Sequence, residues 1–459
     1  MRHVIVGSDT VIGSSIVRLL GSIKADNIIA VSRSGMIPEG VDPKIVEPKF
    51  GDVIDLYILN DIFQEDDIIY HCQIVSDERS SKEEAELINK IGFQNLLGIA
   101  SLSKVQKIVI AFPQALGYDL PKTADENELG KTVSPIQKTL RNARETALNY
   151  INDESFGWAK TNIAKFAKQA EEAELRRKEQ EAQEKAKEDA DTSNEEDTDS
   201  DSSNGGSSSG PSMPSSGPSL GGSSSGPSMP SSGPSLGGSS TDGSVSNLDD
   251  VNNSSELELS DTDKVNDDSP SEEEVDTFED EQLHELKLDR VPLILARLGR
   301  IFGPFDPDLT SQYCKGVRLQ RMEVFGEIDY QISWINPIDG ARAMIILGDP
   351  KTEIKPGEFL VNGFNASPRE ILKTLDKINH STIDLTINPI TKERYKHYLK
   401  SIVSKLGFKV EDNYYHYLSF NRRQVFNDYK VRNAIGWEPN YGLKRTAKDA
   451  FNWFSSHQI

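Results

Sequence analysis

The N-terminal stretch RHVIVGSDTVIGSSIVRLL constrains the fold of this chain more than any other. Residues 2–7 form an apolar run typical of a short buried strand, and an amphipathic helical pattern begins at Ser14. Gly7 and Gly13 bound the turn between them. Such a turn directs free backbone N–H groups and the positive end of a helix dipole at one place, which suits a phosphate group. The stretch therefore predicts the strand–turn–helix unit that opens a dinucleotide-binding sheet.

One position of this turn departs from the dinucleotide pattern. The pattern has a middle glycine, which lets the backbone approach the pyrophosphate, and this chain carries Thr10 there. We expect the Thr10 side chain to crowd the phosphates, while its hydroxyl, with those of Ser8 and Ser14, offers replacement hydrogen bonds. For this stretch alone, the alternative is any α/β sheet that opens with a glycine turn.

Strands and helices alternate along roughly the first third of the chain. The expected strands cover 2–7, 27–32, 43–48, 67–72 and 106–112, and the expected helices cover 12–23, 53–63, 80–102 and 134–151. Such alternation predicts an α/β fold with a doubly wound parallel sheet and helices on both faces.

Further landmarks follow one another along the chain. They are IIAVSRS (28–34), GDVID (51–55), IIYHCQIV (68–75), NKIGFQNLL (89–97), KIVIAF (107–112), LARLGRIFGPFDPD (295–308), WINPIDGARAMI (334–345) and NDYKVRNAIGWEPNYGLKRTAKDAFNWF (427–454). Together with the glycine turn they resemble, in order, the landmarks of the extended short-chain dehydrogenases, the NAD-dependent epimerase/dehydratase family. The resemblance implies a Rossmann-like domain with a small C-terminal substrate lobe.

The resemblance also implies a nicotinamide dinucleotide and the residues that would hold it. These are Gly7, Thr10, Ile12 and Gly13 in the turn, Arg33 after the second strand, Asp52 and Val53 on the adenine side, and Arg141 on the helix over 134–151. An NAD-preferring site carries Asp or Glu at the end of the second strand, where this chain has Arg33 between two serines. A guanidinium pairs with a 2′-phosphate, so we expect NADP rather than NAD.

The family's proton-transfer residues are missing from this chain. The family uses a Ser or Thr near the end of the fifth strand and a Tyr-x-x-x-Lys pair on the next helix. Here Gln137 stands at the Tyr position and Arg141 at the Lys position, and AFPQALGY (111–118) lacks Ser and Thr. Glutamine does not titrate and arginine stays protonated, so neither performs the usual relay. Tyr118 and Lys138 are the candidates for a displaced pair, and for Tyr118 the alternative is a loop aromatic that covers the core.

The middle of the chain has a different composition. Residues 159–190 are dense in charge, with Glu–Lys and Glu–Arg pairs four residues apart and no sustained apolar seam, so they predict a solvated helical arm rather than a coiled coil. Residues 191–285 are rich in acidic residues, Ser, Gly and Pro, and contain GGSSSGPSMPSSGPSL twice, at 205–220 and 221–236. That composition predicts disorder.

These shifts define the expected domains. They are 1–158, the first part of the Rossmann domain; 159–190, the charged arm; 191–285, the disordered acidic insert; and 286–459, the rest of the Rossmann domain with the C-terminal lobe. The insert precedes the strand expected at 290–299, so it should emerge at the edge of the sheet opposite the cofactor. We also expect a shortened chain without residues 160–285 to fold, because loop length changes stability little.

Charge and composition narrow the classes of partner. Residues 171–285 hold 31 acidic and 6 basic residues, a net charge of −25, whereas the whole chain carries −22, so the remainder carries +3. Without a basic stripe, nucleic acid is not an expected partner. Two cysteines and scattered histidines predict neither a disulfide framework nor a metal site. With no signal peptide or membrane-spanning stretch, we expect a cytoplasmic protein with no membrane partner.

The C-terminal half supports the fold more than it identifies a substrate. Asp339 is expected to cap a helix that begins at Gly340, and Ser367 with Pro368 to start another helix after a strand and turn. Residues 391–421 carry Tyr, Lys and His at helical spacing. They either line a nucleotide-sugar pocket or form a partly buried amphipathic helix.

Two functions of different classes remain open from the sequence. One is an NAD(P)-dependent oxidoreductase or epimerase that acts on a nucleotide sugar or a related small molecule through non-standard catalytic groups. The other is a non-catalytic nucleotide-binding or scaffold protein whose acidic insert binds a partner. The family resemblance favours the first and the missing Tyr and Lys favour the second. A homodimer is open in both cases.

Overall fold

A computed structural model describes residues 1–118, 120–152, 290–405 and 413–457, with the side chains of 404 and 405 left out. These residues belong to one compact unit. The expected helical arm at 159–190 and the expected disordered, partner-binding insert at 191–285 lie outside the described residues. No helix among the described residues is both long and apolar enough to cross a membrane.

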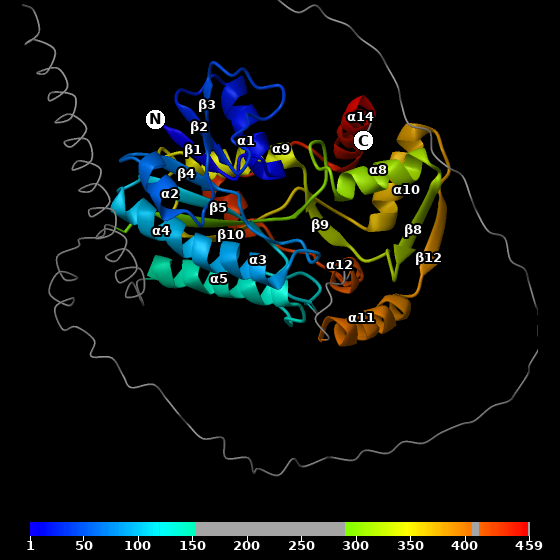
Figure 1. Cartoon of the computed structure of the whole chain (residues 1–459). Coiled ribbons are helices and arrows are strands. Elements are labelled where there is room, and N and C mark those ends of the chain that lie inside the picture. Colours follow the sequence, from blue (N-terminus) through cyan, green and yellow to red (C-terminus); the bar gives the residue numbers. More distant parts are fainter. Residues whose placement is uncertain (119, 153–289, 406–412, 458–459) are drawn as a thin grey trace, which may run out of the picture. The chain divides into compact units, whose positions relative to one another are not determined.

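A seven-stranded sheet organises the unit (Figure 1). Its strands are β1 (His3–Val6), β2 (Ile28–Ser32), β3 (Val46–Phe50), β4 (Ile68–His71), β5 (Lys107–Pro113), β6 (Leu293–Leu298) and β10 (Gly357–Val361). They lie in the order β10-β6-β5-β4-β1-β2-β3, and every neighbouring pair is parallel. The order reverses between β1 and β4, which opens a crevice beyond their carboxyl ends. The predicted doubly wound parallel sheet is confirmed.

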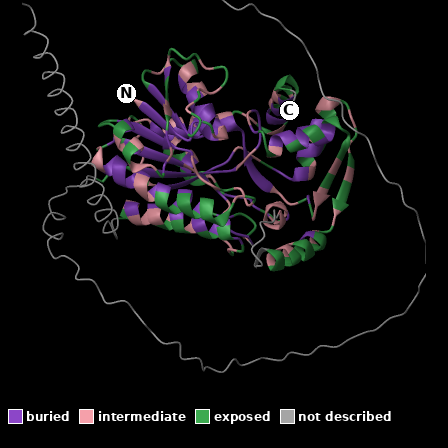
Figure 2. Ribbon diagram, viewed as in Figure 1, coloured by how far each residue is buried: buried purple, intermediate pink, exposed green. Residues whose placement is uncertain are grey.

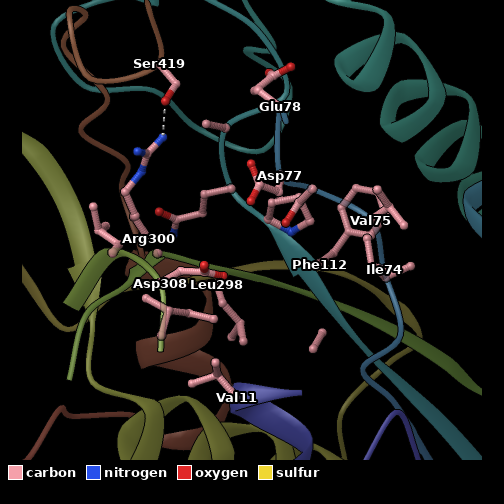
Figure 3. Close-up of a pocket in the computed structure, with 18 of the residues that line it drawn as sticks. Val11, Ile74, Val75, Asp77, Glu78, Phe112, Leu298, Arg300, Asp308 and Ser419 are labelled. Carbon is pink, nitrogen blue, oxygen red and sulfur yellow. Dashed lines mark hydrogen bonds between the residues drawn. The ribbon is translucent and has the colours of Figure 1, made fainter. Parts of the chain in front are cut away.

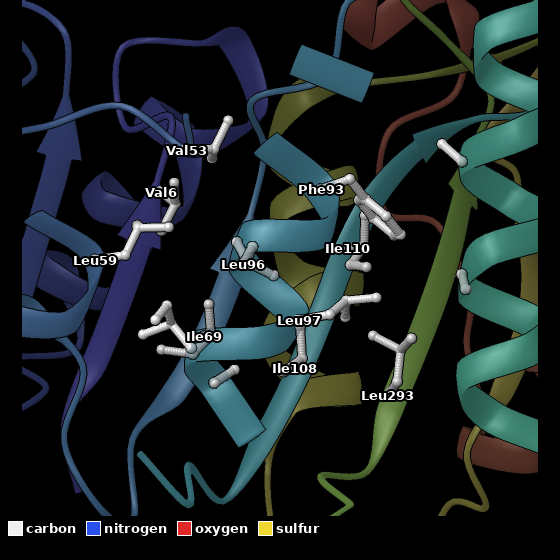
Figure 4. Packing of buried hydrophobic residues seen from close by; sticks show 14 of the residues in the cluster. Val6, Val53, Leu59, Ile69, Phe93, Leu96, Leu97, Ile108, Ile110 and Leu293 are labelled. Carbon is white, nitrogen blue, oxygen red and sulfur yellow. The ribbon is translucent and has the colours of Figure 1, made fainter. Parts of the chain in front are cut away.

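Helices cover both faces of this sheet. One face carries α1 (Val11–Ser22) and α9 (Pro337–Gly348), and the other carries α2 (Leu56–Ile62), α4 (Phe93–Leu102) and α5 (Pro135–Asn152). Successive strand residues point to opposite faces, so Val6 packs in the cluster with Leu59 and Leu96 (Figure 4), whereas Ile5 packs with Ile16 on the other side. Each fully buried side chain of this size contributes about 1.5–3 kcal/mol. Figure 2 shows the strands buried between the two layers.

The expected helix over 80–102 is present, but it is not a regular α-helix. It consists of α3 (Lys82–Glu86), the π-helical turn η1 (Leu87–Gly92) and α4. Within η1, the buried Asn89 accepts a hydrogen bond from the backbone N–H of Val75 at 2.9 Å and donates to the Val75 carbonyl at 2.8 Å. A π turn inserts one residue into a helix, commonly at functional sites. Here it accompanies the attachment of the loop after β4.

A small C-terminal lobe packs around Trp334, whose indole N–H donates to the carbonyl of Ala366 at 2.9 Å. Its strands are β7 (Arg300–Ile301), β8 (Arg321–Phe325), β9 (Ile332–Ile335), β11 (Phe364–Ala366) and β12 (Asp384–Asn388). Its helices are α8 (Leu309–Arg318), α10 (Pro368–Asn379), α11 (Ile390–Lys405), α12 (Tyr414–Leu418) and α14 (Leu443–His457), and α13 (Tyr429–Ile435) returns to the sheet beside β10. The predicted second lobe is confirmed.

Two helix starts and one strand start test the sequence interpretation. Ser367 begins α10 through a complete capping box with Glu370, as expected. Asp339 does not cap α9, so that prediction was wrong: Asn336 is the N-cap and Pro337 the first helical residue. The Asp339 carboxylate instead accepts the backbone N–H groups of 440 and 441 at 3.0 and 2.9 Å. β3 begins three residues later than expected because residues 42–45 form a hydrogen-bonded turn.

The end of α5 lies next to the start of β6. The hydroxyl of Tyr150, near the end of α5, accepts the backbone N–H of Val291, just before β6, at 3.0 Å. Both points lie at the amino-terminal edge of the parallel sheet, away from the carboxyl ends of β1 and β4. A helix that precedes a parallel strand ends at the edge of the sheet where that strand begins, which is the arrangement of α5 and β6.

Candidate functional site

A cavity of about 670 Å³ opens at the carboxyl edge of the sheet. Its walls come from the glycine turn after β1, the loop after β4, the end of β5, α5, the β6–β7 segment and the C-terminal lobe. Ligands of open α/β sheets bind at this place, where the strand order reverses. The size suits a small molecule rather than a macromolecule.

Close packing explains both glycines of the turn. Gly7 has a φ of +82°, and a Cβ built on it would lie 2.7 Å from the backbone nitrogen of Gln73. A Cβ on Gly13 would lie 2.1 Å from the Gly7 carbonyl oxygen. The fold of the turn itself therefore requires these glycines, whether or not a phosphate binds there.

Thr10 closes the turn with its own side chain. Its hydroxyl donates to the Gly7 carbonyl at 2.8 Å and accepts the Gly13 N–H at 3.1 Å, so Thr10 is the N-cap of α1. The N–H of Gly13 is one of the donors that a phosphate at this helix would use. Thr10 and Ile12 line the cavity, and so does the carboxyl-bearing Asp9. An anion must therefore compete with Thr10 for the helix N-terminus.

The residues expected on the adenosine side form a network of their own. Arg33 forms an ion pair with Asp52 and lies 3.6 Å from a carboxylate oxygen of Glu84. Gln73 donates to Asp52 at 3.0 Å and accepts the backbone N–H of Val53 at 3.4 Å. Val53 is fully buried. None of these side chains is among the described residues that line the cavity, so the network lies beyond its edge.

The residues at and near the family's catalytic positions separate into two groups. Gln137 and Tyr118 are buried and line the cavity together. Arg141 instead donates to the backbone carbonyls of Leu116, Leu129 and Gly130, and it is not among the lining residues. Lys138 is exposed and also absent from the lining. The structure thus brings together the Tyr position and Tyr118 and places Arg141 and Lys138 elsewhere.

The loop after β4 supplies charged residues that the sequence analysis did not single out. Asn89 holds Val75 at the start of this loop, and Asp77 and Glu78 follow on the cavity wall (Figure 3). Asp77 accepts hydrogen bonds from the Nε of Arg79 at 2.9 and 3.0 Å. Burial raises the pKa of Asp77, but hydrogen bonds from His416 and Arg79 outweigh burial and hold this pKa well below its usual range. Asp77 is therefore a fixed negative charge.

Glu78 behaves differently from its neighbour. Its Oε2 is buried and has no hydrogen-bond partner among the described residues. Burial raises the pKa of its carboxyl to about 7; the Ser134 hydroxyl and the Arg300 charge oppose this rise only partly. Burial and the charge of Glu78 raise the pKa of Tyr118 far above its usual value, so this phenol stays neutral. Glu78 thus changes its protonation state near neutral pH.

Arg300 of β7 provides a positive charge on the same wall. Its Nη2 donates to the Ser419 hydroxyl at 3.0 Å, the contact drawn as a dashed line in Figure 3. Its guanidinium carbon lies 4.0 Å from the centre of the Phe420 ring. Burial lowers the pKa of Arg300, but from so high a value that the guanidinium remains charged.

The segment 391–421 divides into two parts that differ in their contact with the cavity. The second part, around α12, brings His416, Ser419 and Phe420 to the cavity. The first part, α11, contributes no lining residue among those described and leaves Tyr395 and Tyr398 66% and 62% exposed. The expectation of a pocket-lining segment is therefore met by the second part, whereas α11, in which Glu393 is the only buried residue among the described side chains, is not the partly buried amphipathic helix that we expected.

Both cysteines, Cys72 and Cys314, are free and buried in the described part of the chain. Within the same residues, no group of three or more His, Cys, Asp or Glu side chains is placed to hold a metal ion.

No sequence-family model and no curated protein sequence matches this chain. Solved structures do match its fold. UDP-glucose 4-epimerase from Thermotoga maritima, solved with UDP-glucose, is 12% identical with a TM-score of 0.55 over 100% of both chains. UDP-glucuronic acid 4-epimerase from Bacillus cereus, solved with UDP-glucuronic acid and NAD, is 11% identical with a TM-score of 0.56 over 100% of both chains. UDP-glucose 4-epimerase from Thermus thermophilus, solved with NAD, is 13% identical with a TM-score of 0.56 over 99% of both chains.

Proposed function

Because the chain has the fold of the extended short-chain dehydrogenases, the family that its landmarks resemble, we propose that it binds a nicotinamide dinucleotide and acts as an oxidoreductase or epimerase on a nucleotide sugar or related small molecule. The observation that carries the proposal is the cavity at the reversal of strand order, bounded by a glycine turn on one side and the C-terminal lobe on the other. The structural neighbours with NAD and UDP-sugars support it.

Dinucleotide binding would compete with the cap that Thr10 forms at the N-terminus of α1. A dinucleotide pyrophosphate over α1 would displace the Thr10 hydroxyl from the Gly13 N–H, and an N-cap hydrogen bond contributes about 1 kcal/mol. Such a cost corresponds to roughly a fivefold loss of affinity, since about 1.4 kcal/mol is tenfold. The turn therefore weakens dinucleotide binding without abolishing it.

The choice between the two cofactors depends on Arg33. This side chain is half exposed at the end of β2, where a 2′-phosphate would lie, and we propose NADP rather than NAD. A 2′-phosphate would have to take Arg33 from Asp52 and Glu84. Exposed ion pairs contribute only about 0.2–1 kcal/mol, so this exchange is inexpensive.

Titration of the purified protein with NADPH and NADH tests the proposal. Nucleotide fluorescence reports binding, and melting temperature reports stabilisation of the native state. A ligand at a hundredfold excess over its dissociation constant stabilises by about 2.7 kcal/mol. We expect saturable binding, tighter for NADPH, and an Arg33→Ala variant should lose that preference while keeping its NADH affinity. Binding of neither nucleotide would contradict the proposal and favour the non-catalytic scaffold.

A further inference from the structure

The proposed reaction needs a group that exchanges a proton with a substrate hydroxyl, and Gln137 cannot be that group. Most other titratable side chains on the cavity wall are committed elsewhere. Asp77 is paired with Arg79, and Arg79 also lies 3.3 Å from Asp308. His416 lies 3.8 Å from Asp77, and burial raises the pKa of the Cys72 thiol far above its usual range.

We propose that Glu78 is the catalytic acid–base of this cavity, exchanging a proton with a substrate hydroxyl in the role that the absent tyrosine has elsewhere in the fold. This inference rests on the proposed function, because it assumes a substrate and a hydride acceptor in the same cavity. It assigns the step to the loop after β4 rather than to α5.

The position of Glu78 supports this assignment. Glu78 lies on the cavity wall with Tyr118 and Gln137, and the hydroxyls of Ser134 and Tyr118 interact with its carboxyl. The buried Oε2 remains without a partner in the described part of the chain. A buried carboxyl oxygen without a partner is costly in a structural role, whereas it is free to meet a substrate hydroxyl.

The loop that carries Glu78 is fixed, as proton transfer requires. Three residues before Glu78, both backbone groups of Val75 bond to the side chain of Asn89, and Asn89 also donates to the Thr139 hydroxyl of α5 at 3.0 Å. One residue after Glu78, the backbone N–H of Arg79 donates to the Asp77 carboxylate at 2.9 Å. The π turn that contains Asn89 thus positions the loop against α5.

Burial, opposed by neighbouring groups, keeps Glu78 near the midpoint of its titration at neutral pH. The titratable groups that act on Glu78 are Asp77 on its own loop, Arg300 on β7 and Tyr118 after β5; Arg79, His416 and Asp308 line the same cavity. Burial raises the pKa of the Glu78 carboxyl to about 7. A group with a pKa near the working pH both accepts and returns a proton efficiently.

The proposed step balances in charge and electrons. In the oxidative direction, the O–H bond of a substrate hydroxyl breaks and its proton passes to the ionised Glu78 carboxylate. The hydrogen on the same carbon leaves with its electron pair as hydride and reduces an oxidised nicotinamide. The products are a carbonyl group, neutral Glu78 and the reduced nicotinamide. The reverse step returns the proton from Glu78 to the carbonyl oxygen.

The test compares wild type with Glu78→Gln, Glu78→Asp and the control Glu83→Gln, which alters an exposed residue of α3. Each protein is loaded with whichever of NAD or NADP it binds and mixed with UDP-glucose or UDP-glucuronic acid, and nucleotide reduction is followed by absorbance. We expect Glu78→Gln to slow reduction about a hundredfold or more and Glu78→Asp to restore part of it. Glu83→Gln should stay within about twofold of wild type.

A second readout needs neither substrate nor nucleotide. Infrared difference spectra of wild type against Glu78→Gln isolate the C=O band of a neutral Glu78 from those of other carboxyls, including Asp67, whose pKa burial raises to about 6. We expect the Glu78 band to titrate near pH 7. A carboxyl already ionised at about pH 5 would overturn the inference, whatever the activity.

The outcomes separate this inference from the proposed function. Nucleotide binding with a Glu78→Gln rate close to wild type overturns only the role of Glu78. Failure to bind either nucleotide overturns the proposed function and this inference with it. A slowed Glu78→Gln, together with a neutral-pH titration of the band, supports both.

Discussion

The two sides of the cavity differ in the kind of polar group that they leave without a partner. At the glycine turn, Thr10 caps its own helix and the neighbouring Arg33, Asp52 and Gln73 bond to one another, while the buried hydroxyl of Ser8 has no partner in the described residues. At the loop after β4, Glu78 keeps a buried carboxylate oxygen without a partner in the described residues. A buried polar group without a partner costs stability. Of these two groups only the Glu78 carboxyl lines the cavity and has a pKa near neutral, which is the basis of our proposal that the loop after β4 is the reactive side.

The largest expected effect comes from breaking the glycine turn. In Gly13→Ala the new Cβ would lie 2.1 Å from the Gly7 carbonyl oxygen, so either the turn must open or the helix must shift. We expect a loss of about 3 kcal/mol or more in the free energy of unfolding, measured by denaturant titration. The matched control is Gly357→Ala, whose Cβ would meet its nearest atom at 3.8 Å. Equal stability of the two variants would show that the turn is not the tightly packed region inferred here.

The pH dependence of stability tests the loop after β4, which carries Glu78. Because the folded-state pKa of Glu78, about 7, lies above its ordinary value of 4.5, the folded protein binds more protons than the unfolded protein between these values. Stability therefore falls as pH rises through this window. After a discount for partial exposure to solvent, the raised pKa of Glu78 changes the free energy of unfolding by about 2 kcal/mol across this pH window. Glu78→Gln should flatten the corresponding part of the melting-temperature profile, while the contribution of Asp67 stays. An unchanged profile would contradict the raised pKa.

A weaker effect, on nucleotide affinity, is expected when the Thr10 hydroxyl is removed from the glycine turn. Thr10→Gly restores the family's middle glycine and frees the Gly13 N–H, so nucleotide affinity should rise about fivefold to tenfold, measured by fluorescence titration. Stability should fall by only a few tenths of a kcal/mol, because glycine is a tolerated N-cap. Thr10→Ser keeps the capping hydroxyl and is the control. Equal affinities in all three proteins would mean that the cap does not compete with the phosphate.

The sequence was informative about the sheet and less so about these walls. Apolar runs of strand length located β1, β2, β4 and β5 within one or two residues, because strands buried on both faces have a strong local signature. Thr10 was recognised as unusual, but its action as a cap depends on the geometry of the turn. Asp339 lies in a sequence typical of a helix start, but the helix begins three residues earlier, with Asn336 as its N-cap.

Glu78 shows why the sequence alone does not identify this side of the cavity. In the sequence it stands in the polar run SDERSSKEE (76–84), beside acidic residues that are exposed on the helix surface. The groups that act on its carboxyl include Tyr118, Ser134 and Arg300, which come from distant parts of the chain. No local pattern distinguishes Glu78 from Glu83, so only tertiary structure identifies it.

The smallest effect on stability and nucleotide affinity is expected from shortening the chain between α5 and β6, at the amino-terminal edge of the sheet and away from the cavity. The hydrogen bond between Tyr150 and Val291 shows that α5 and β6 meet at that edge, so a short linker in place of residues 160–285 spans a short distance. Each halving of a loop changes the free energy of closure by only about 0.6 kcal/mol. The shortened protein should therefore melt cooperatively and keep its nucleotide affinity and the pH profile of Glu78. Cooperative melting with altered nucleotide affinity would mean that the removed residues act on the cavity, and loss of cooperative melting would mean that the fold itself depends on them.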